Sequence, residues 1–358
     1  MANPVPDFRE PPFAGAPEAR FEPAPADGVL PEGFFATSNL PTYVKTGSGW
    51  SMPARPRMDG AVIRREGELV TVEPRSVRRG EQVAMGLAED GSEGIVVHTR
   101  GFLGGATSGN EFRFMSTEVS RERPVDYEEL AKRVETERRN GGFLVWVVGP
   151  ALVHARARID LAWFIANGYV QAMLIGNAVA VHDIEAAIYG TTLGMGQGGK
   201  AVERGHSLHM RAINRVAAAG SIDRAVEEGI VGDGIMHALV RHQVPYVLAG
   251  SIRDDGPLPG VITDTSAAQD AMREYTCRAT GAIFVATALH AIAVGNMLPA
   301  FHTERGAPEP LMTICVDQTE FVVNKLRDRG THQAYGVVTN AQDFMHVFRH
   351  YIEKCRQS

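Results

Sequence analysis

From Pro124 onward, short segments that are apolar at almost every position alternate with segments of helical periodicity. The first apolar segment, Phe143–Val148, follows a helical stretch that Asp126 and Glu129 open in the manner of a capping box. Strands that are apolar throughout are buried on both faces, which is typical of parallel sheets covered by helices. We therefore expect an α/β domain over residues 124–358, built on a doubly wound, Rossmann-like parallel sheet. The pattern predicts its further strands at 169–175, 245–249, 281–287, 313–316 and 334–338.

The part of the chain before this domain has a different pattern. Residues 31–123 contain short β-prone pieces, such as Ala61–Ile63 and Leu69–Val72, that are separated by charged turns. This spacing predicts a small all-β domain, with an open barrel as one arrangement. Residues 1–30 are rich in proline, alanine and acidic residues, so we expect a disordered arm or one that follows the surface.

The composition argues against several classes of protein. A net charge of −6 without a dense Lys/Arg cluster argues against a nucleic-acid partner. No apolar stretch reaches the ~20 residues that a membrane-spanning helix needs, and the N-terminus lacks the pattern of a secretion signal. The three cysteines, Cys277, Cys315 and Cys355, have no spacing typical of a metal site. We therefore expect a cytoplasmic protein without a metal or a membrane partner.

The loop after the predicted strand at 245–249 concentrates charge. It carries Arg253, Asp254 and Asp255 among glycines and prolines. Ligands of open α/β sheets bind outside the carboxyl ends of the strands, so these three residues are candidates for catalysis. A plain turn is the alternative, because Asp, Gly and Pro are also the residues that turns select.

Small residues beside a polar or turn-forming group recur after several predicted strands. Glycine lets a backbone approach a ligand closely, and a helix that follows offers free N–H groups to a phosphate. Tight turns between strand and helix are the alternative explanation. The pattern G-x-G-x-x-G is absent after the first strand, so a standard dinucleotide fingerprint is not claimed. The residues predicted in this way to contact a cofactor are Gly149, Pro150, Ala151, Gly176, Asn177, Ala178, Gly250, Ser251, Gly295, Asn296 and Met297.

Three more polar residues are weighed as site residues. Asp317 ends an apolar run and can either hydrogen-bond the hydroxyls of a ribose or cap a helix that starts near Thr319. His182 lies five positions after Asn177 and is a candidate polar site residue. His290 lies in an apolar helical run, where we expect a satisfied core histidine.

Several long segments match one family in order along the chain. They are Gly149–Ala151 with His154, Gly176–Glu185, Arg211–Asn214, Ala249–Pro259 and Ala293–Pro299, with Asn39–Val44 and Phe114–Ser120 in the predicted β domain. On these segments the chain resembles the archaeal-type ornithine cyclodeaminases, whose domain is also labelled LOR/SDH-related. The same domain forms the C-terminal part of cyanobacterial arginine dihydrolase–ornithine cyclodeaminases. The chain departs from the family pattern at Gly60, where the family usually has a cysteine, and at Gln318–Glu320 after Asp317.

The resemblance implies an NAD-binding domain of the deoxyhypusine-synthase-like type behind a small β domain. It implies conversion of L-ornithine to L-proline and ammonia by a homodimer or homotetramer, without the arginine-dihydrolase module of the fused enzymes. Asp183 and Asn214 join the expected cofactor contacts, and Asn39 and Thr42 are expected to contact the substrate.

A mechanism for such a reaction can be assigned to the charged residues. Arg253 would pair with the substrate carboxylate, and Asp254 or Asp255 would hold an ammonium group and accept its proton. His182 would act as a proton shuttle. Because the NADH that forms returns its hydride to the cyclic imine, the cycle is redox-neutral.

Two other functions are compatible with the same residues. A dehydrogenase or imine reductase using NAD(P) on another basic or opine-like amino acid would change the amount of NADH stoichiometrically. A non-catalytic, NAD-binding regulatory protein would bind the nucleotide and turn over no basic amino acid.

Overall fold

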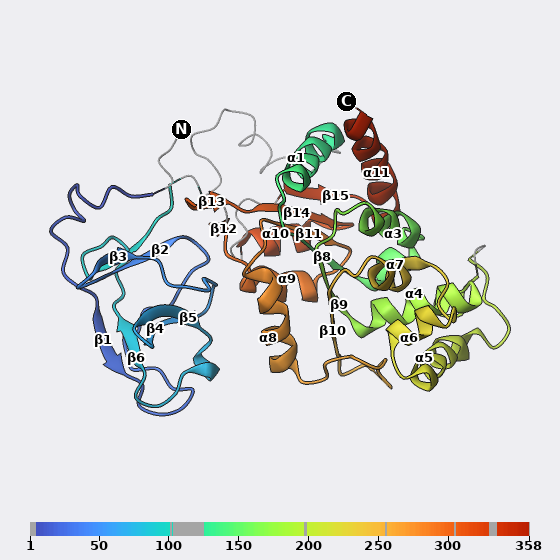
Figure 1. Ribbon diagram of the computed structural model, residues 1–358, viewed down its shortest axis with the longest axis horizontal. Helices are drawn as coiled ribbons and strands as arrows, with labels where there is room; N and C mark the ends of the chain where they lie inside the picture. Colours follow the sequence, from blue (N-terminus) through green and yellow to red (C-terminus); the bar gives the residue numbers. More distant parts are fainter. Residues whose placement is uncertain are drawn as a thin grey trace. The chain divides into compact units, whose positions relative to one another are not determined.

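The computed structural model describes residues 5–100, 102, 125–196, 199–254, 256–303, 306–328 and 335–357. The chain divides into two compact units, both of which are drawn in Figure 1. Unit 1 comprises residues 1–123, 295–312 and 326–333, and unit 2 comprises residues 124–294, 313–325 and 334–358. The segments 295–312 and 326–333, which the sequence pattern places in the α/β domain, are therefore grouped with the β unit.

Unit 2 is built on a six-stranded sheet with the strand order β10–β9–β8–β11–β14–β15. The pairs β10–β9, β9–β8, β8–β11 and β14–β15 are parallel. Numbered along the chain, the order is 3-2-1-4-5-6, which is that of doubly wound dinucleotide-binding sheets. The predicted Rossmann-like sheet is thus confirmed. Its strands are β8 (Leu144–Val148), β9 (Ala172–Gly176), β10 (Tyr246–Ala249), β11 (Gly281–Val285), β14 (Met312–Asp317) and β15 (Tyr335–Val338).

Helices cover both faces of this sheet (Figure 1). On one face are α2 (Pro150–His154), α3 (Arg158–Ala166), α4 (Asn177–Tyr189), α5 (Leu208–Ala219), α6 (Ile222–Glu227) and α7 (Gly234–Arg241), with the 3-10 turn Gly205–Ser207 before α5. On the other face are α8 (Thr265–Thr276), α9 (Leu289–Met297) and α10 (Glu320–Asp328). No helix in the described ranges is long and apolar enough to cross a bilayer.

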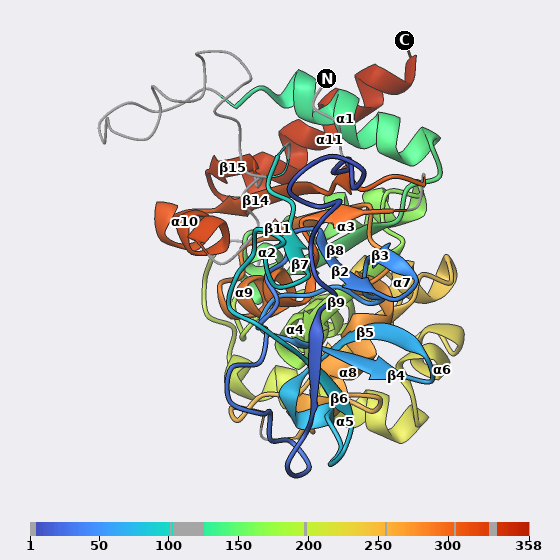
Figure 2. The ribbon, with the colours of Figure 1, turned by 90° about the vertical axis from the view of Figure 1, so that its left-hand side faces the viewer.

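The helices α1 (Tyr127–Arg139) and α11 (Ala341–Gln357) lie side by side at one end of unit 2 (Figure 2). Asp126 caps α1 by accepting a 2.9 Å hydrogen bond from the N–H of Glu129, which confirms the predicted start of this helix. Gly190 and Gly220 end α4 and α5 in the left-handed conformation, which glycine adopts without strain.

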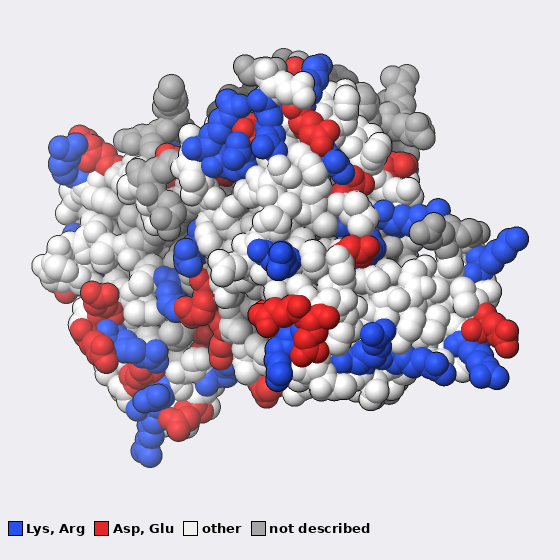
Figure 3. Space-filling view, turned by 45° about the vertical axis from the view of Figure 1, so that its right-hand side comes forward, with Lys and Arg blue, Asp and Glu red and all other residues white. Residues whose placement is uncertain are grey.

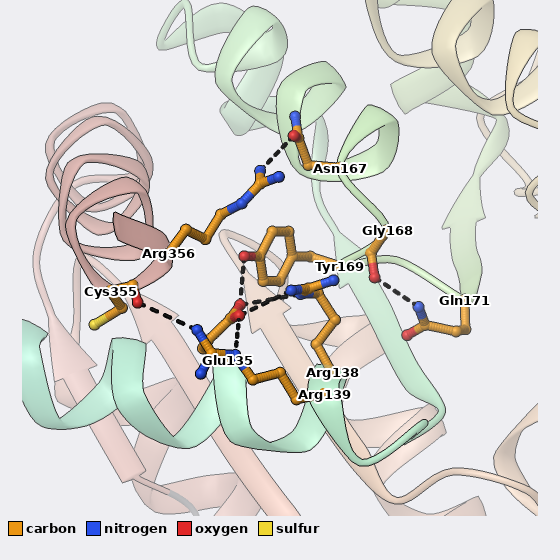
Figure 4. Close-up of polar contacts among 9 residues, drawn as sticks. All are labelled: Glu135, Arg138, Arg139, Asn167, Gly168, Tyr169, Gln171, Cys355 and Arg356. Atoms are coloured by element: carbon orange, nitrogen blue, oxygen red, sulfur yellow. Dashed lines mark hydrogen bonds and ion pairs between the residues drawn. The ribbon is translucent and has the colours of Figure 1, made fainter. Parts of the chain in front are cut away.

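A polar cluster around Glu135 joins the end of α1 to the segment before β9 (Figure 4). The Glu135 carboxylate accepts hydrogen bonds from Tyr169 Oη at 2.6 Å, from Arg138 at 2.8 Å and from Arg139 at 2.7 Å. These bonds, with that from Arg138 the strongest, lower the pKa of Glu135 to about 2 although burial opposes the shift. Glu135 is therefore an ionised structural anchor.

Unit 1 contains two antiparallel sheets and a short strand pair. The first sheet has the order β1–β6–β4–β5 and the second the order β3–β2–β7, so the β-rich character predicted for 31–123 takes the form of separate sheets. The strands are β1 (Arg20–Pro23), β2 (Thr42–Thr46), β3 (Gly49–Ser51), β4 (Ala61–Arg65), β5 (Glu68–Val72), β6 (Gln82–Met85), β7 (Ile95–Val97), β12 (Phe301–His302) and β13 (Glu309–Pro310), with a 3-10 turn at Pro74–Ser76.

Residues 5–30 contribute to unit 1 more than the expected arm would. The strand β1 pairs with β6 from Arg20 to Pro23, and the ring of Phe8 stacks on that of Trp50 with a centroid distance of 5.2 Å. A proline-rich composition predicts little core, but it does not exclude an edge strand that uses the backbone alone.

Candidate active site

The order of the strands in unit 2 reverses between β8 and β11. In doubly wound sheets, ligands bind outside the carboxyl ends of the strands at such a point. Here the segments that leave β8 and β11 approach each other closely. Gly149 N–H donates to the Val285 carbonyl at 2.9 Å, and a Cβ on Gly149 would overlap the carbonyl oxygen of Ala286. The predicted segment Gly149–Ala151 therefore lies at the switch point, with Pro150 and Ala151 opening α2.

The start of α4 is the best candidate for holding an anion. Gly176 is its N-cap, in an extended conformation and without a side-chain cap, so the first N–H groups of this 13-residue helix, at Asn177 and Ala178, have no capping partner. Such a helix end attracts phosphate through its free donors and its dipole. Asn177 itself is buried, and its Oδ1 accepts the N–H of Leu258 at 3.1 Å, which ties α4 to the loop after β10.

The loop after β10 is closed by its own hydrogen bonds. Gly250 N–H donates to the Ile262 carbonyl at 2.8 Å, and Ser251 N–H donates to Asp254 Oδ2 at 2.8 Å. Arg253 is exposed, and its N–H reaches Ser251 Oγ at 3.3 Å. The guanidinium of Arg253 has no ion-pair partner among the described residues, so it is available to a ligand. Asp255 lies outside the residues that the structure describes.

His182 lies on α4 and is nearly buried. Its Nδ1 is 3.6 Å from Glu185 Oε2, and its ring centroid is 4.7 Å from that of His154 on α2. The Nδ1 of His154 hydrogen-bonds to Thr192. Burial, followed by the neighbouring His182, lowers the pKa of His154, which favours its neutral form. The described contacts of His182 are thus to α2 and to its own helix.

Glu185 anchors the segment that follows α4. Burial raises the pKa of Glu185, but the nearby His182 and hydrogen bonds from the following segment outweigh it and lower the pKa below its ordinary value. The carboxylate of Glu185 accepts bonds from Thr191 Oγ1 at 2.8 Å, Leu193 N at 3.0 Å and Gly194 N at 2.9 Å. An ionised Glu185 therefore holds the chain after α4.

Asp183, expected at the cofactor, has only internal contacts among the described residues. Its carboxylate has no solvent exposure, and its two oxygens accept bonds from Arg158 Nε at 2.7 Å and Met236 N at 2.8 Å. These contacts use the carboxylate to join α3, α4 and α7. The geometry favours a structural role for Asp183, because a fully buried carboxylate with both oxygens engaged offers little to a ligand.

Asn214 and Asp317 lie on α5 and at the end of β14, respectively. Asn214 is exposed on α5. Asp317 ends β14, and its Oδ1 accepts bonds from Thr319 N at 3.1 Å and Thr319 Oγ1 at 3.2 Å. The carboxylate thus folds onto the turn before α10, as in the helix-start alternative, while its second oxygen has no hydrogen bond among the described residues.

Gly295, Asn296 and Met297 were expected after a longer connection from the strand at 281–287. They form the last turn of α9, which begins at Leu289 after β11 ends at Val285. A Cβ on Gly295 would lie 2.8 Å from Leu326 Cδ2, so this glycine allows close packing at a helix. Apolar periodicity marked the helix but did not show that it continues through a glycine.

In unit 1, Asn39 and Thr42 are both buried. Thr42 Oγ1 donates to the Leu40 carbonyl at 3.2 Å. Among the described residues, Asn39 Nδ2 and Asn296 Oδ1 are buried atoms without a hydrogen-bond partner. A donor and an acceptor left unpaired in this way cost stability unless a ligand or water meets them.

One residue at the carboxyl edge was missed as a site residue. His290 lies in the first turn of α9, and a Cβ on Gly176 would be 2.9 Å from its Cε1. The ring therefore reaches from the helix after β11 to the end of β9. The expectation of a satisfied core histidine is wrong, because the half-buried ring makes no hydrogen bond or ion pair with any described residue. Periodicity does not reveal which strands are neighbours, so the sequence carries no signal for this position.

Charges on the molecule do not form a single-sign field on the face drawn in Figure 3, where acidic and basic side chains are interspersed. Within the described ranges, no group of three or more His, Cys, Asp or Glu side chains is placed to hold a metal ion. The candidate site therefore consists of glycine-lined strand ends, the free start of α4, the Arg253–Asp254 loop and His290.

The sequence and the structure of this chain are similar to those of several known proteins. The sequence matches the family described as arginine dihydrolase ArgZ-like, C-terminal, Rossmann fold, over residues 128–348, and its first-region counterpart over residues 41–128. It is 45% identical over 333 residues to the ornithine cyclodeaminase of Methanopyrus kandleri, covering 92% of this chain and 77% of the relative. It is 38% identical over 350 residues to the bifunctional arginine dihydrolase/ornithine cyclodeaminase AgrE of Nostoc sp., covering 94% of this chain and 47% of AgrE.

Two solved structures resemble the whole chain. A LOR/SDH protein of Methanococcus maripaludis superposes with a TM-score of 0.85 at 39% identity, covering 95% of this chain and 99% of that protein. AgrE in a ternary complex with ornithine and NAD+ superposes with a TM-score of 0.61 at 35% identity, covering 96% of this chain and 47% of AgrE.

Proposed function

This chain belongs to the family of ArgZ-like C-terminal regions, and from that membership we propose that it is an NAD-dependent ornithine cyclodeaminase. It converts L-ornithine to L-proline and ammonia. The observation that carries the proposal is the 45% identity over 92% of the chain with an archaeal ornithine cyclodeaminase. The likeness to AgrE, whose structure holds ornithine and NAD+, supports the same reaction.

The residues of unit 2 fit a dinucleotide. The strand order reverses beside Gly149, and the uncapped start of α4 offers N–H donors next to Gly176, which has no side chain to obstruct a phosphate. Gly149–Ala151, Gly176–Ala178 and Gly250–Ser251 would line the cofactor. NAD, when bound, supplies a hydride acceptor and donor within one turnover, so no net oxidation occurs.

Substrate roles follow from the charges of the loop after β10. The exposed guanidinium of Arg253 is suited to a two-point pair with the ornithine carboxylate. Asp254, which also accepts the Ser251 N–H at 2.8 Å, would hold an ammonium group of the substrate, or Asp255 would do so. Three further assignments stay predictions. Asn39 and Thr42 would contact the substrate, and His182 would act as a proton shuttle. The cofactor contacts would include Asn214, Asn296, Met297 and Asp317.

The compartment and the assembly belong to the same proposal. We expect a cytoplasmic homodimer or homotetramer that binds a small basic amino acid and neither nucleic acid nor membrane.

The proposal is tested by incubating the purified protein with L-ornithine and substoichiometric NAD+. Proline and ammonia should form in equal amounts and in excess of the cofactor, with no net NADH. NADH that accumulates in proportion to substrate would instead indicate a dehydrogenase. A thermal shift with NAD+ and no turnover of ornithine or lysine would indicate a regulatory protein.

A further inference from the structure

His290 occupies an unusual position at the carboxyl edge of the sheet. It belongs to α9, which follows β11, yet its ring lies against Gly176 at the end of β9, on the far side of β8. The ring thus spans the point where the strand order reverses. The Ala249 carbonyl oxygen, at the start of the loop that carries Arg253, would be 3.8 Å from the same Gly176 Cβ.

The chemistry around His290 is that of a neutral base. Burial lowers its pKa below the ordinary value for histidine, and no charged group contributes to this shift. The ring lies against the backbone of Gly176, where a Cβ would be 2.9 Å from its Cε1 and 3.4 Å from its Nε2, and the described residues give its nitrogens no hydrogen-bond partner. The ring nitrogens of His290 are not among the buried polar atoms that lack a partner, so they are open to solvent or to a ligand.

The proposed reaction requires such a base. Ornithine enters with its α-amino group protonated, and the Cα–H bond cannot be oxidised to an imine until that nitrogen has its electron pair free. A base with a pKa near or below neutrality must therefore remove one proton from the bound substrate.

We propose that His290 is the catalytic base that takes the proton from the α-ammonium group of ornithine, and this role rests on the proposed function. One N–H bond of the ammonium breaks, its electron pair stays on the substrate nitrogen, and the proton forms a new N–H bond on a free ring nitrogen of His290. The imidazolium that results gives this proton back when ammonia leaves, so the step needs no other reactant. In this scheme Arg253 and Asp254 hold the substrate, and His290 keeps the proton until the departing ammonia takes it up.

The first test compares wild-type protein with His290→Gln and with the control His242→Gln, a change at an exposed position at the end of α7. His290→Gln should lower kcat for proline formation by roughly 100-fold or more, as for loss of general-base catalysis. Its NAD+ dissociation constant should stay within about threefold of the wild-type value, a span that is under 0.7 kcal/mol.

The pH profile gives a further measurement on the same variant. In wild type, kcat/KM should fall at acid pH, below the ordinary histidine pKa, and this decrease should disappear in His290→Gln. Imidazole added to His290→Ala should restore part of the activity.

The second test does not depend on turnover or on the folding of a variant. In wild-type protein labelled at histidine Cε1, the His290 resonance should titrate below the ordinary histidine pKa without ligands, and it should move when ornithine is added with NAD+. The missing resonance in His290→Gln gives the assignment.

The outcomes separate the two proposals. Wild-type protein that forms no proline would overturn the proposed function and, with it, the role of His290. Wild-type activity together with unchanged kcat and pH profile in His290→Gln, or a resonance that ornithine leaves unmoved, would overturn the role of His290 alone.

Discussion

The Asp183 carboxylate accepts a 2.7 Å hydrogen bond from Arg158 Nε although its own side chain is completely buried. Arg158 also reaches Asp233 at 2.6 Å, and Met236 N–H donates to the second oxygen of Asp183. Burial raises the pKa of Asp183 against the opposing charge of Arg158, whereas the charges of Asp183 and Asp233 raise the pKa of Arg158 although burial opposes this. Because both oxygens of Asp183 accept N–H donors, we assign the ionised form. Three helices of unit 2 are therefore joined by one buried ion pair.

This relationship predicts that Asp183→Asn destabilises the protein. The change leaves the guanidinium of Arg158 buried without its main counter-charge, which costs about 3–5 kcal/mol of unfolding free energy. Urea unfolding measures the loss, with Asp233→Asn as the control, since the Asp233 side chain is 61% exposed and its pair is worth at most about 1 kcal/mol. NAD+ affinity of the folded Asp183→Asn protein should match wild type. A large selective loss of NAD+ affinity at full stability would instead support the cofactor role that the resemblance implies.

Glu135→Gln should show a pH-dependent loss of stability. The pKa of Glu135 is about 2 in the folded protein against an ordinary value of 4.5, so its stabilising effect is complete above pH 4.5 and is lost as pH falls toward 2. At pH 7 the variant should be less stable by roughly 2 kcal/mol, because charge-assisted hydrogen bonds are lost. Urea unfolding between pH 3 and pH 7 should show this difference narrowing below pH 4.5.

The control for this prediction is Glu128→Gln. Glu128 pairs with Lys132 on the exposed face of the same helix at 2.8 Å, and such pairs contribute little. A constant difference between Glu135→Gln and wild type across the pH range would contradict the assigned ionisation.

More of the fold than of the candidate site could be predicted from the sequence. Runs such as Phe143–Val148 are apolar at every position and too short for a buried helix, so their alternation with helical segments predicted the parallel sheet. The cap at Asp126 followed from a local hydrogen bond that depends on nearby residues alone. By contrast, the ring of His290 meets Gly176 only because β9 and β11 both neighbour β8. Strand order is set by the whole fold, and local patterns do not contain it.

The same reasoning explains why local patterns did not show that Gly295 lies within a helix or that Arg20–Pro23 forms a strand. Glycine after an apolar run is read as a turn, but α9 tolerates Gly295 because Leu326 fills the space that a side chain would need. The strand β1 lies in a proline-rich segment, where composition predicts no core. Both cases depend on a partner segment that is distant in the sequence.

Gly149→Ala should damage the edge of the parallel sheet. A Cβ there would overlap the Ala286 carbonyl oxygen, which is backbone and cannot rotate away, so β8 and β11 must separate at their ends. We expect a loss of about 3 kcal/mol in unfolding free energy, at the upper end for overpacking, together with weaker NAD+ binding. Gly232→Ala is the matched control, since a Cβ at Gly232 meets nothing within 4 Å. Equal stability of the two variants would show that the close approach is not required.

Gly60→Ala tests the position where the chain departs from the family pattern. A Cβ at Gly60 would lie 2.8 Å from Thr71 Cγ2 and 3.0 Å from Thr37 Oγ1, the hydroxyl that accepts the Gly60 N–H. The overpacking should cost about 1–3 kcal/mol of unfolding free energy. Gly47→Ala is the control, because a Cβ there meets only Glu18 Oε1 at 3.7 Å.

A double variant shows whether the cost at Gly60 comes from this contact. Gly60→Ala combined with Thr71→Ser removes the methyl group nearest to the new Cβ, so part of the stability should return. If the two changes simply add, the cost arises elsewhere at this position. The Cβ of a cysteine at position 60 would meet the same neighbours, together with the Val72 carbonyl oxygen at 3.0 Å.

Arg253→Lys separates substrate binding from chemistry. A lysine keeps the positive charge but cannot form the two parallel hydrogen bonds of a guanidinium with a carboxylate. The loop itself should keep its shape, because its described hydrogen bonds use the Arg253 N–H, Ser251 and Asp254 and not the guanidinium. Losing one charge-assisted bond of about 1.5–3 kcal/mol should raise KM for ornithine by roughly tenfold to a hundredfold at saturating NAD+. The NAD+ dissociation constant should not change. Arg241→Lys, at an exposed position on α7, is the matched control. An unchanged KM in Arg253→Lys would mean that the substrate carboxylate is held elsewhere, and a loss of NAD+ affinity would mean that Arg253 binds the nucleotide.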